Sequence, residues 1–219
     1  MMEIRKSAGT EETAQYVAGV LSKELQAGKK VLFFVPGGSG VDVAMKISAL
    51  LVEVGLQNLT VMQTDERYGD VWHKDSNWAQ LLSAGKVFAG ATLLPVLTGK
   101  SFEETVACYE QELDKQFSLT NVSIGLFGMG ADGHTAGILP KSTAAYAKTL
   151  AHGYHTPTYL RITMTAHAIR KIGEAVLFAM GNEKKEMFAR LRGGNPAEED
   201  VPAQTLKSTG KLTVFTNAL

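Results

Sequence analysis

Short apolar runs that end directly in glycine-rich or charged turns recur along the chain, and they constrain its fold more than any other feature. Val31–Val35 has no polar interruption and leads into the turn PGGSG at 36–40. Leu59–Gln63 leads in the same way into the charged turn TDER at 64–67. Uninterrupted strands are typical of parallel sheets, which are covered on both faces. We therefore expect these turns to project into one crevice at the carboxyl edge of a sheet.

Helical patterns alternate with the apolar runs. We expect helices at 11–27, 43–54, 75–82, 103–116, 165–172 and 182–191. Further strands are expected at 122–127, 159–163, 175–180 and 212–215, with a weaker one at 91–97. The alternation predicts an α/β fold with a mostly parallel sheet and helices on both faces. Since no repeat or linker interrupts the pattern, residues 1–219 are expected to form one domain.

The stretch 121–140, NVSIGLFGMGADGHTAGILP, is the best candidate for chemistry. A buried strand is predicted to break into a turn containing Gly128, Gly130 and Gly133, and glycines let backbone approach a ligand closely. Asp132 and His134 lie inside this turn and are able to work together on a proton. In α/β proteins, ligand-binding and catalytic residues commonly lie in such turns, outside the carboxyl ends of the strands.

Two other interpretations of this stretch stay open. GMGADG matches the dinucleotide fingerprint G-x-G-x-x-G, although a dinucleotide-binding site also requires an acidic residue about 20 positions further on. None is present at 150–154, and Asp132 would place negative charge where a pyrophosphate must lie. Alternatively, Asp132 caps a helix and His134 is solvated. Thr135 and Ala136 permit a helical turn here, which Pro140 would end.

The balance of charge limits the classes of partner. Lys plus Arg and Asp plus Glu number 22 each, so nothing favours a nucleic-acid or membrane-surface partner, and any anion site must be local. The single Cys108 excludes an internal disulfide and a cysteine metal cluster, and its place in a helical pattern predicts a small core residue. No apolar run has transmembrane length and the first eight residues lack a signal-peptide pattern, so the cytoplasm is expected.

Five segments, taken together and in order, resemble the 6-phosphogluconolactonase family, part of a wider group that includes the glucosamine-6-phosphate deaminases. They are PGGSG at 36–40, TDER at 64–67 with DSN at 75–77, GMGADGHTAGILP at 128–140, RIT at 161–163 and GNEK at 181–184. The resemblance runs from about residue 15 to about residue 205. It implies a modified Rossmann-type sheet, hydrolysis of 6-phosphoglucono-δ-lactone, and no metal or cofactor. A sugar phosphate is the expected partner, and a monomer or weak homodimer the expected state.

The resemblance also implies roles for individual residues. His134 is similar to the family's general base, with Asp132 beside it, and Arg67 to the arginine over the reacting region, with Asp65 in the same motif. The matching substrate and phosphate contacts are Gly37, Gly38, Ser39, Gly130, Arg161 and Lys184. A lactone is an activated ester, so a positioned water and a base that is neutral near pH 7 suffice, and histidine suits that task.

The chain departs from the family pattern in four places. The glycine loop usually continues Ser-Thr-Pro, whereas Ser39 is followed here by Gly40 and Val41, so one phosphate-binding hydroxyl is missing. The usual Val-Pro after Asp-Glu-Arg is replaced near 69–70, and the usual Ala-Ser-Leu-Phe-Pro reads AGILP at 136–140. The end of the chain after Thr213 lacks the family's aromatic-Asp ending.

Two rival functions remain. Deaminase–isomerases carry an aromatic residue where this chain has Arg67, and a glutamate, paired with the histidine, where it has Leu139. A non-catalytic sugar-phosphate sensor would not need Asp132 and His134.

The other histidines form no metal-ligand spacing such as H-E-x-x-H. We expect those at 73, 152 and 155 in loops and the one at 167 on a helix.

Overall fold

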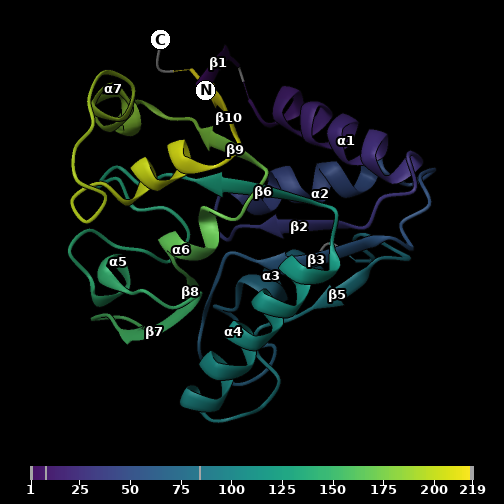
Figure 1. The fold of residues 1–219 in the computed structure, drawn as a ribbon, viewed down its shortest axis with the longest axis horizontal. Helices are drawn as coiled ribbons and strands as arrows, with labels where there is room; N and C mark the ends of the chain where they lie inside the picture. The colour runs from purple at the N-terminus through teal and green to yellow at the C-terminus, as the bar shows by residue number, and fades with distance from the viewer. Residues whose placement is uncertain (1, 8, 84, 218–219) are drawn as a thin grey trace.

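The computed structural model describes residues 2–7, 9–83 and 85–217, and its main element is a seven-stranded sheet in which every neighbouring pair is parallel (Figure 1). The strand order is β1-β10-β9-β6-β2-β3-β5. The strands are β1 (Met2–Lys6), β2 (Val31–Val35), β3 (Leu59–Gln63), β5 (Thr92–Leu94), β6 (Val122–Gly128), β9 (Glu174–Ala179) and β10 (Lys211–Thr216). The predicted α/β fold with a mostly parallel sheet is confirmed.

Helices cover both faces of this sheet. Figure 1 shows α1 and α2 on one side of the strands and α4 on the other. The α-helices are α1 (Thr10–Gln26), α2 (Gly40–Leu50), α3 (Asn77–Leu82), α4 (Phe102–Leu119), α5 (Thr143–Tyr146), α6 (Ala166–Ile169) and α7 (Lys185–Gly193). Two 3₁₀ segments, η1 (Asn182–Lys184) and η2 (Pro202–Ser208), complete the helical elements of the described residues. The longest helix, α4, starts at a capping box in which Ser101 and Glu104 exchange hydrogen bonds.

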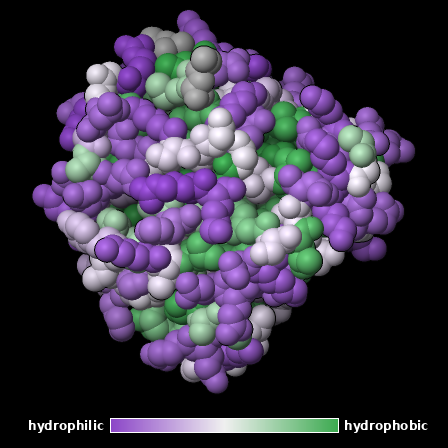
Figure 2. Space-filling view, viewed as in Figure 1, coloured by the Kyte–Doolittle hydropathy of each residue, from purple (hydrophilic) through white to green (hydrophobic). Residues whose placement is uncertain are grey.

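The strand β2 shows why its sequence is apolar throughout. All five of its side chains are buried, and they alternate between two hydrophobic cores. Leu32 and Phe34 join the core beneath α4, whereas Phe33 joins the core beneath α1 and α2. Outside these cores the face seen in Figure 2 is mostly hydrophilic, with scattered apolar residues.

The order of the strands creates a crevice between β2 and β6. From β2 the chain proceeds outward to β3 and β5, and from β6 it proceeds the opposite way to β9 and β10. Parallel α/β sheets bind ligands outside the carboxyl ends of strands at such a switch point. The turn at 36–40 follows β2 and the turn at 128–133 follows β6, so both lie at this crevice.

A second, three-stranded antiparallel sheet was not predicted. It has the order β4-β8-β7 and consists of β4 (Asp65–Arg67), β8 (Leu160–Met164) and β7 (Ala151–His155). Thr64 links the two sheets, because its N–H donates to Val35 of β2 while its carbonyl accepts from Met164 of β8. The charged residues at 65–67 are therefore a strand and not a turn, and the predicted strand at 159–163 belongs to this smaller sheet.

Several smaller predictions are wrong. The histidines at 152 and 155 lie in β7 and not in loops. Thr135 and Ala136 begin no helical turn, since Thr135 pairs with Ile138 in an isolated bridge and Ala136 has φ 49°. Cys108 is partly exposed and not a core residue, with its sulfur 3.1 Å from Nζ of Lys100.

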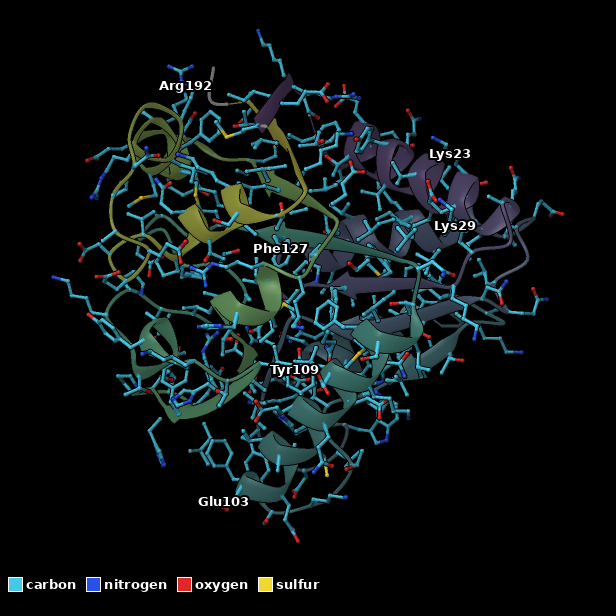
Figure 3. All side chains as sticks on the ribbon, in the orientation of Figure 1. Lys23, Lys29, Glu103, Tyr109, Phe127 and Arg192 are labelled. Atoms are coloured by element: carbon cyan, nitrogen blue, oxygen red, sulfur yellow. The ribbon has the colours of Figure 1, made fainter. Side chains whose placement is uncertain are left out.

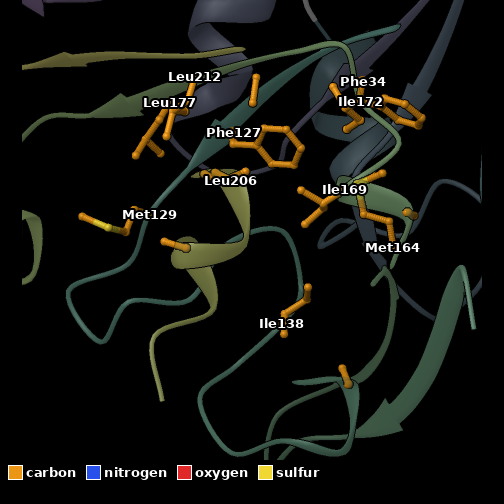
Figure 4. Packing of buried hydrophobic residues seen from close by; sticks show 14 of the residues in the cluster. Phe34, Phe127, Met129, Ile138, Met164, Ile169, Ile172, Leu177, Leu206 and Leu212 are labelled. Atoms are coloured by element: carbon orange, nitrogen blue, oxygen red, sulfur yellow. The ribbon is translucent and has the colours of Figure 1, made fainter. Parts of the chain in front are cut away.

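Phe127, which lies in the core beneath α4, tests the energetics of the sheet. The ring is fully buried among side chains from β9, α6 and η2 (Figures 3 and 4). We expect Phe127→Ala to lower the free energy of unfolding, measured by urea denaturation, by about 3–5 kcal/mol, because it removes a buried ring and leaves a cavity. Leu119→Ala, at a side chain that is 52% exposed, is the control and should change it by less than about 0.5 kcal/mol. Equal losses in the two variants would contradict this account of the core.

Candidate active site

A cavity of about 220 Å³ lies where the turns after β2 and β6 meet the second sheet. It is lined by Pro36, Gly37, Gly38, Ser39, Asp65, Arg67, Asn77, Gly128, Met129, Gly130, His134, Ala136, Arg161 and Lys184. The structure thus brings every predicted site residue except Asp132 into the wall of one cavity. Asp132 does not line the cavity itself, but it contacts His134, which does.

Asp132 holds His134 in a defined orientation. Oδ1 of Asp132 lies 2.6 Å from Nδ1 of His134 and also accepts the His134 backbone N–H at 3.1 Å. A carboxylate only accepts hydrogen bonds, so Nδ1 carries the proton and Nε2 is left as an acceptor. The two side chains are 36% and 51% exposed, for His134 and Asp132 respectively, so water can reach the ring.

Gly130 leaves the space that the imidazole occupies. A Cβ at this position would overlap Nδ1 and Cε1 of His134 and lie 2.5 Å from Oδ1 of Asp132. The Gly130 N–H also donates to the His134 carbonyl at 2.9 Å, which closes the turn. Gly133 has φ 90°, a conformation that favours glycine. The glycines of this turn are therefore needed to place the Asp–His pair.

Two arginines face one another across the second sheet. Arg67 on β4 is the direct antiparallel partner of Arg161 on β8, so both guanidinium groups leave the same face. Like charges opposite each other are unfavourable. Asp65, two residues from Arg67 and on that face, lies 3.5 Å from Arg161 and offsets part of the repulsion. An anion in the cavity would offset the rest.

Hydrogen-bonding capacity is unused around these arginines. Four buried side-chain nitrogen or oxygen atoms lack a partner among the residues that the structure describes, and three belong to the cavity wall: Nε of Arg67, Nε of Arg161 and Oδ1 of Asn77. The rest of Arg67 is fixed, since its Nη1 donates to the Asp75 carbonyl at 2.9 Å and its guanidinium lies over the Tyr159 ring. The two arginine Nε–H groups are buried donors without a partner, which is costly, so they indicate a site adapted to an anionic ligand.

The turn after β2 offers backbone donors beside a free cation. Within the described part of the chain, the N–H groups of Gly38 and Ser39 form no hydrogen bond, and they precede the N-terminus of α2, where the helix dipole favours anions. The Lys184 ammonium lines the same cavity and has no ion-pair or hydrogen-bond partner among the described residues. These groups fit a phosphate.

Sequence reasoning did not select Asn77 as a site residue. Its Nδ2 donates to the Asp65 carbonyl at 2.9 Å, and its amide occupies the space beside Gly37 where a Cβ would lie. Asn77 belongs to the DSN motif, but a motif does not show that a side chain packs beneath a glycine loop. Glu66 is the converse case, since it lies between two cavity residues in sequence but faces away and does not line the cavity.

Within the described ranges, no three His, Cys, Asp or Glu side chains are placed to hold a metal ion together. No helix of that part of the chain is long and apolar enough to cross a membrane.

Comparison with known proteins agrees with this geometry. The family model for glucosamine-6-phosphate isomerases/6-phosphogluconolactonase matches residues 5–215. The 6-phosphogluconolactonase of Neisseria meningitidis serogroup A is 29% identical over 208 residues, which cover 85% of this chain and 87% of that protein. The 6-phosphogluconolactonase of Helicobacter pylori is 26% identical over 212 residues, which cover 93% of this chain and 88% of that protein.

Two solved structures show how widely the fold is shared. The 6-phosphogluconolactonase of Thermotoga maritima has a TM-score of 0.80 at 19% identity and covers 99% of each chain. A monomeric glucosamine-6-phosphate deaminase has a TM-score of 0.82 at 21% identity and covers 98% of this chain and 97% of that one. The fold alone therefore does not separate a lactonase from a deaminase.

The fold and the cavity define the class: an α/β enzyme in which an Asp–His pair, two arginines and backbone N–H donors are gathered at the carboxyl edge of a parallel sheet. Within that class, the match over residues 5–215 places the chain: it belongs to the glucosamine-6-phosphate isomerase/6-phosphogluconolactonase family.

The orientation of His134 can be tested directly. We expect long-range ¹H–¹⁵N correlation spectra of the neutral ring to show the tautomer protonated at Nδ1, because Asp132 accepts that proton. Asp132→Ala should abolish this preference at His134, while the spectrum of His167, on the exposed face of α6, serves as the internal control. A wild-type His134 protonated at Nε2 would contradict the proposed geometry.

Proposed function

We propose that the protein hydrolyses 6-phosphoglucono-δ-lactone to 6-phosphogluconate, in the oxidative branch of the pentose phosphate pathway. The observation that carries this proposal is the contact between Nδ1 of His134 and Asp132. It leaves Nε2 as a base on the wall of a cavity that also presents arginines and a phosphate-binding turn. Relatives named 6-phosphogluconolactonase support the same reaction.

The base acts on water. Nε2 of His134 takes a proton as the water oxygen attacks the lactone carbonyl, and the resulting imidazolium is stabilised by Asp132. The carbonyl oxygen becomes an oxyanion, and the guanidinium of Arg67 offers the positive charge that it needs. Collapse of the tetrahedral intermediate breaks the bond to the ring oxygen, which leaves with the proton from His134 as a hydroxyl group. The new carboxylic acid then loses its proton to solvent.

The phosphate is held away from this step. Gly37, Gly38 and Ser39 supply backbone donors, and Lys184 supplies a charge-assisted hydrogen bond. Arg161, which contacts Asp65 and pairs with Arg67 across the second sheet, supplies a further cation for the phosphate. The attacked carbonyl is already activated in a lactone, so a base, a water molecule and a cation suffice, and the step needs no metal or cofactor.

One observation disfavours the deaminase. Deaminase–isomerases pair a glutamate with the histidine, and the corresponding residue here is Leu139, which packs against the hydrophobic core and has no proton to exchange. Release of ammonia from glucosamine 6-phosphate, with the lactone left untouched, would establish the deaminase instead.

We also propose that residues 1–219 form one domain, acting in the cytoplasm as a monomer or weak homodimer.

Removing the base is the first test of the function. His134→Asn should lower kcat for the lactone by about 10²–10⁴-fold with little change in KM, because the side chain keeps its polarity but no longer accepts a proton. The assay couples product formation to 6-phosphogluconate oxidation and subtracts spontaneous lactone opening. The control is His167→Asn, a histidine outside the cavity, which should keep wild-type kcat. A His134→Asn enzyme with near wild-type kcat would refute the assignment.

Phosphate binding gives an independent test. We expect inorganic phosphate to inhibit competitively, and Lys184→Ala should weaken binding of both the lactone and phosphate by about 1.5–3 kcal/mol, the range for one charge-assisted hydrogen bond. Lys185→Ala is the matched control, since Lys185 is the exposed first residue of α7 and does not line the cavity. If the inhibition constant for phosphate is unchanged in Lys184→Ala, Lys184 belongs to the solvated surface.

A further inference from the structure

Glu66 is a buried carboxylate beside the active site that the reaction does not use. It lies on β4 between Asp65 and Arg67, and its side chain leaves the opposite face of the strand. Its exposure is 0%, so it cannot reach water in the cavity. A charged group is rarely buried in this way unless it is fully hydrogen-bonded.

Each oxygen of Glu66 accepts two hydrogen bonds. Oε1 accepts the backbone N–H of Arg67 at 2.8 Å and that of Asn77 at 2.7 Å. Oε2 accepts the hydroxyl of Ser76 at 2.9 Å and the backbone N–H of Trp78 at 3.0 Å. One carboxylate therefore joins the end of β4 to the start of α3.

These contacts fix residues of the cavity wall. Through Oε1, Glu66 binds the backbone of Arg67 and of Asn77, and both side chains line the cavity. The same two segments exchange two further bonds, from Nη1 of Arg67 to the Asp75 carbonyl and from Nδ2 of Asn77 to the Asp65 carbonyl, both 2.9 Å. The position of the Arg67 guanidinium thus depends on where the segment at 75–77 is held.

The acceptor must be a carboxylate for this arrangement to form. Burial raises the pKa of Glu66, and the hydrogen bonds from the backbone of Asn77, Trp78 and Arg67 and from Ser76 act in the opposite direction. Three of the four partners are backbone N–H groups, which can only donate, whereas an amide offers one acceptor oxygen and one NH₂ group. In either orientation, glutamine would therefore point its NH₂ group at one or two backbone donors.

We propose that Glu66 is a positioning residue for lactone hydrolysis: it sets the Arg67 guanidinium at the reacting carbonyl by holding β4 against the start of α3. The proposal rests on the proposed lactonase function. It assigns Glu66 no contact with substrate and no proton transfer.

The test compares Glu66→Gln with Ser76→Ala. Ser76→Ala removes one bond to Oε2 and the cap of α3, where Ala79 donates to the Ser76 hydroxyl at 3.1 Å, but leaves both bonds to Oε1. We expect Glu66→Gln to lower kcat about 10- to 100-fold, because small displacements of a catalytic group have effects of that size. Its inhibition constant for inorganic phosphate should stay within about threefold of wild type. Ser76→Ala should lower the melting temperature but keep kcat.

A double variant of Glu66 and Arg67 distinguishes a positioning role of Glu66 from a general loss of protein stability. If Glu66 acts through Arg67, adding Glu66→Gln to Arg67→Ala should lower kcat by less than about twofold further, since neighbouring residues that act as a unit are not additive. A full further loss in the double variant would overturn the proposal. So would unchanged kcat in Glu66→Gln, or equal loss of kcat and of phosphate binding.

A measurement that does not depend on catalysis distinguishes failure of the positioning role of Glu66 from failure of the proposed lactonase function. The Nε–H resonance of Arg67, assigned by its absence in Arg67→Ala, should shift in Glu66→Gln and remain in place in Ser76→Ala. A wild-type protein that leaves the lactone untouched refutes the proposed function, whereas an unshifted Arg67 resonance in Glu66→Gln refutes the positioning role.

Discussion

The parallel pairing of β2 with β6 is the constraint on which the site depends. These strands lie at the centre of the sheet and pair from Val31 with Val122 to Phe34 with Gly125. β2 is apolar throughout and β6 is apolar apart from Ser123, because helices cover both faces of the sheet. Since the chain leaves them in opposite directions, no helix closes the space beyond their carboxyl ends. The glycine turn of β2 and the Asp–His turn of β6 therefore meet over the same crevice.

The second sheet supplies what that crevice lacks. The turns of the main sheet provide the Asp132–His134 pair and backbone N–H donors, but the cavity's two arginines both come from the pairing of β4 with β8. Arg67 and Arg161 are opposite each other there, an arrangement that is unfavourable until a negative charge lies between or beside them. Asp65 offsets part of the repulsion between these cations, and an anionic ligand or an oxyanion beside them would offset the rest.

The sequence predicted the parts of this site that depend on local chemistry. Apolar runs, glycine turns and motif spacing located β2, β3, β6 and β9, the Asp132–His134 pair and the cavity wall contributed by Gly37 and Lys184. It did not predict the second sheet, because Asp65 pairs with Thr163 almost a hundred residues later and the three residues of β4 resemble a charged corner. Nor did it predict β1, whose partner β10 lies at the other end of the chain. The buried role of Glu66 depends on the same long-range contacts.

The departures from the family pattern have local structural explanations. Gly40 stands where the family usually has a threonine, and a Cβ there would overlap the ring of Pro36, which lines the cavity. Gly137 stands where the family usually has a serine, and a Cβ there would lie 2.8 Å from Cβ of Thr163, whose hydroxyl accepts the Gly137 N–H. In both cases a neighbouring side chain fills the space, so a larger residue in place of the glycine would require that side chain to move.

The departure at the C-terminus falls partly in β10, which continues through Thr216, and partly beyond it, where the last two residues lie outside the described part of the chain.

At the turn after β2, the packing of Pro36 in the space beside Gly40 has a chemical consequence. If this turn binds the phosphate as we propose, the absence of a hydroxyl at Gly40 leaves the backbone N–H groups of Gly38 and Ser39 and the Lys184 ammonium as its donors. In that case Lys184 contributes a larger share of the binding energy than it would beside a turn with an additional hydroxyl donor.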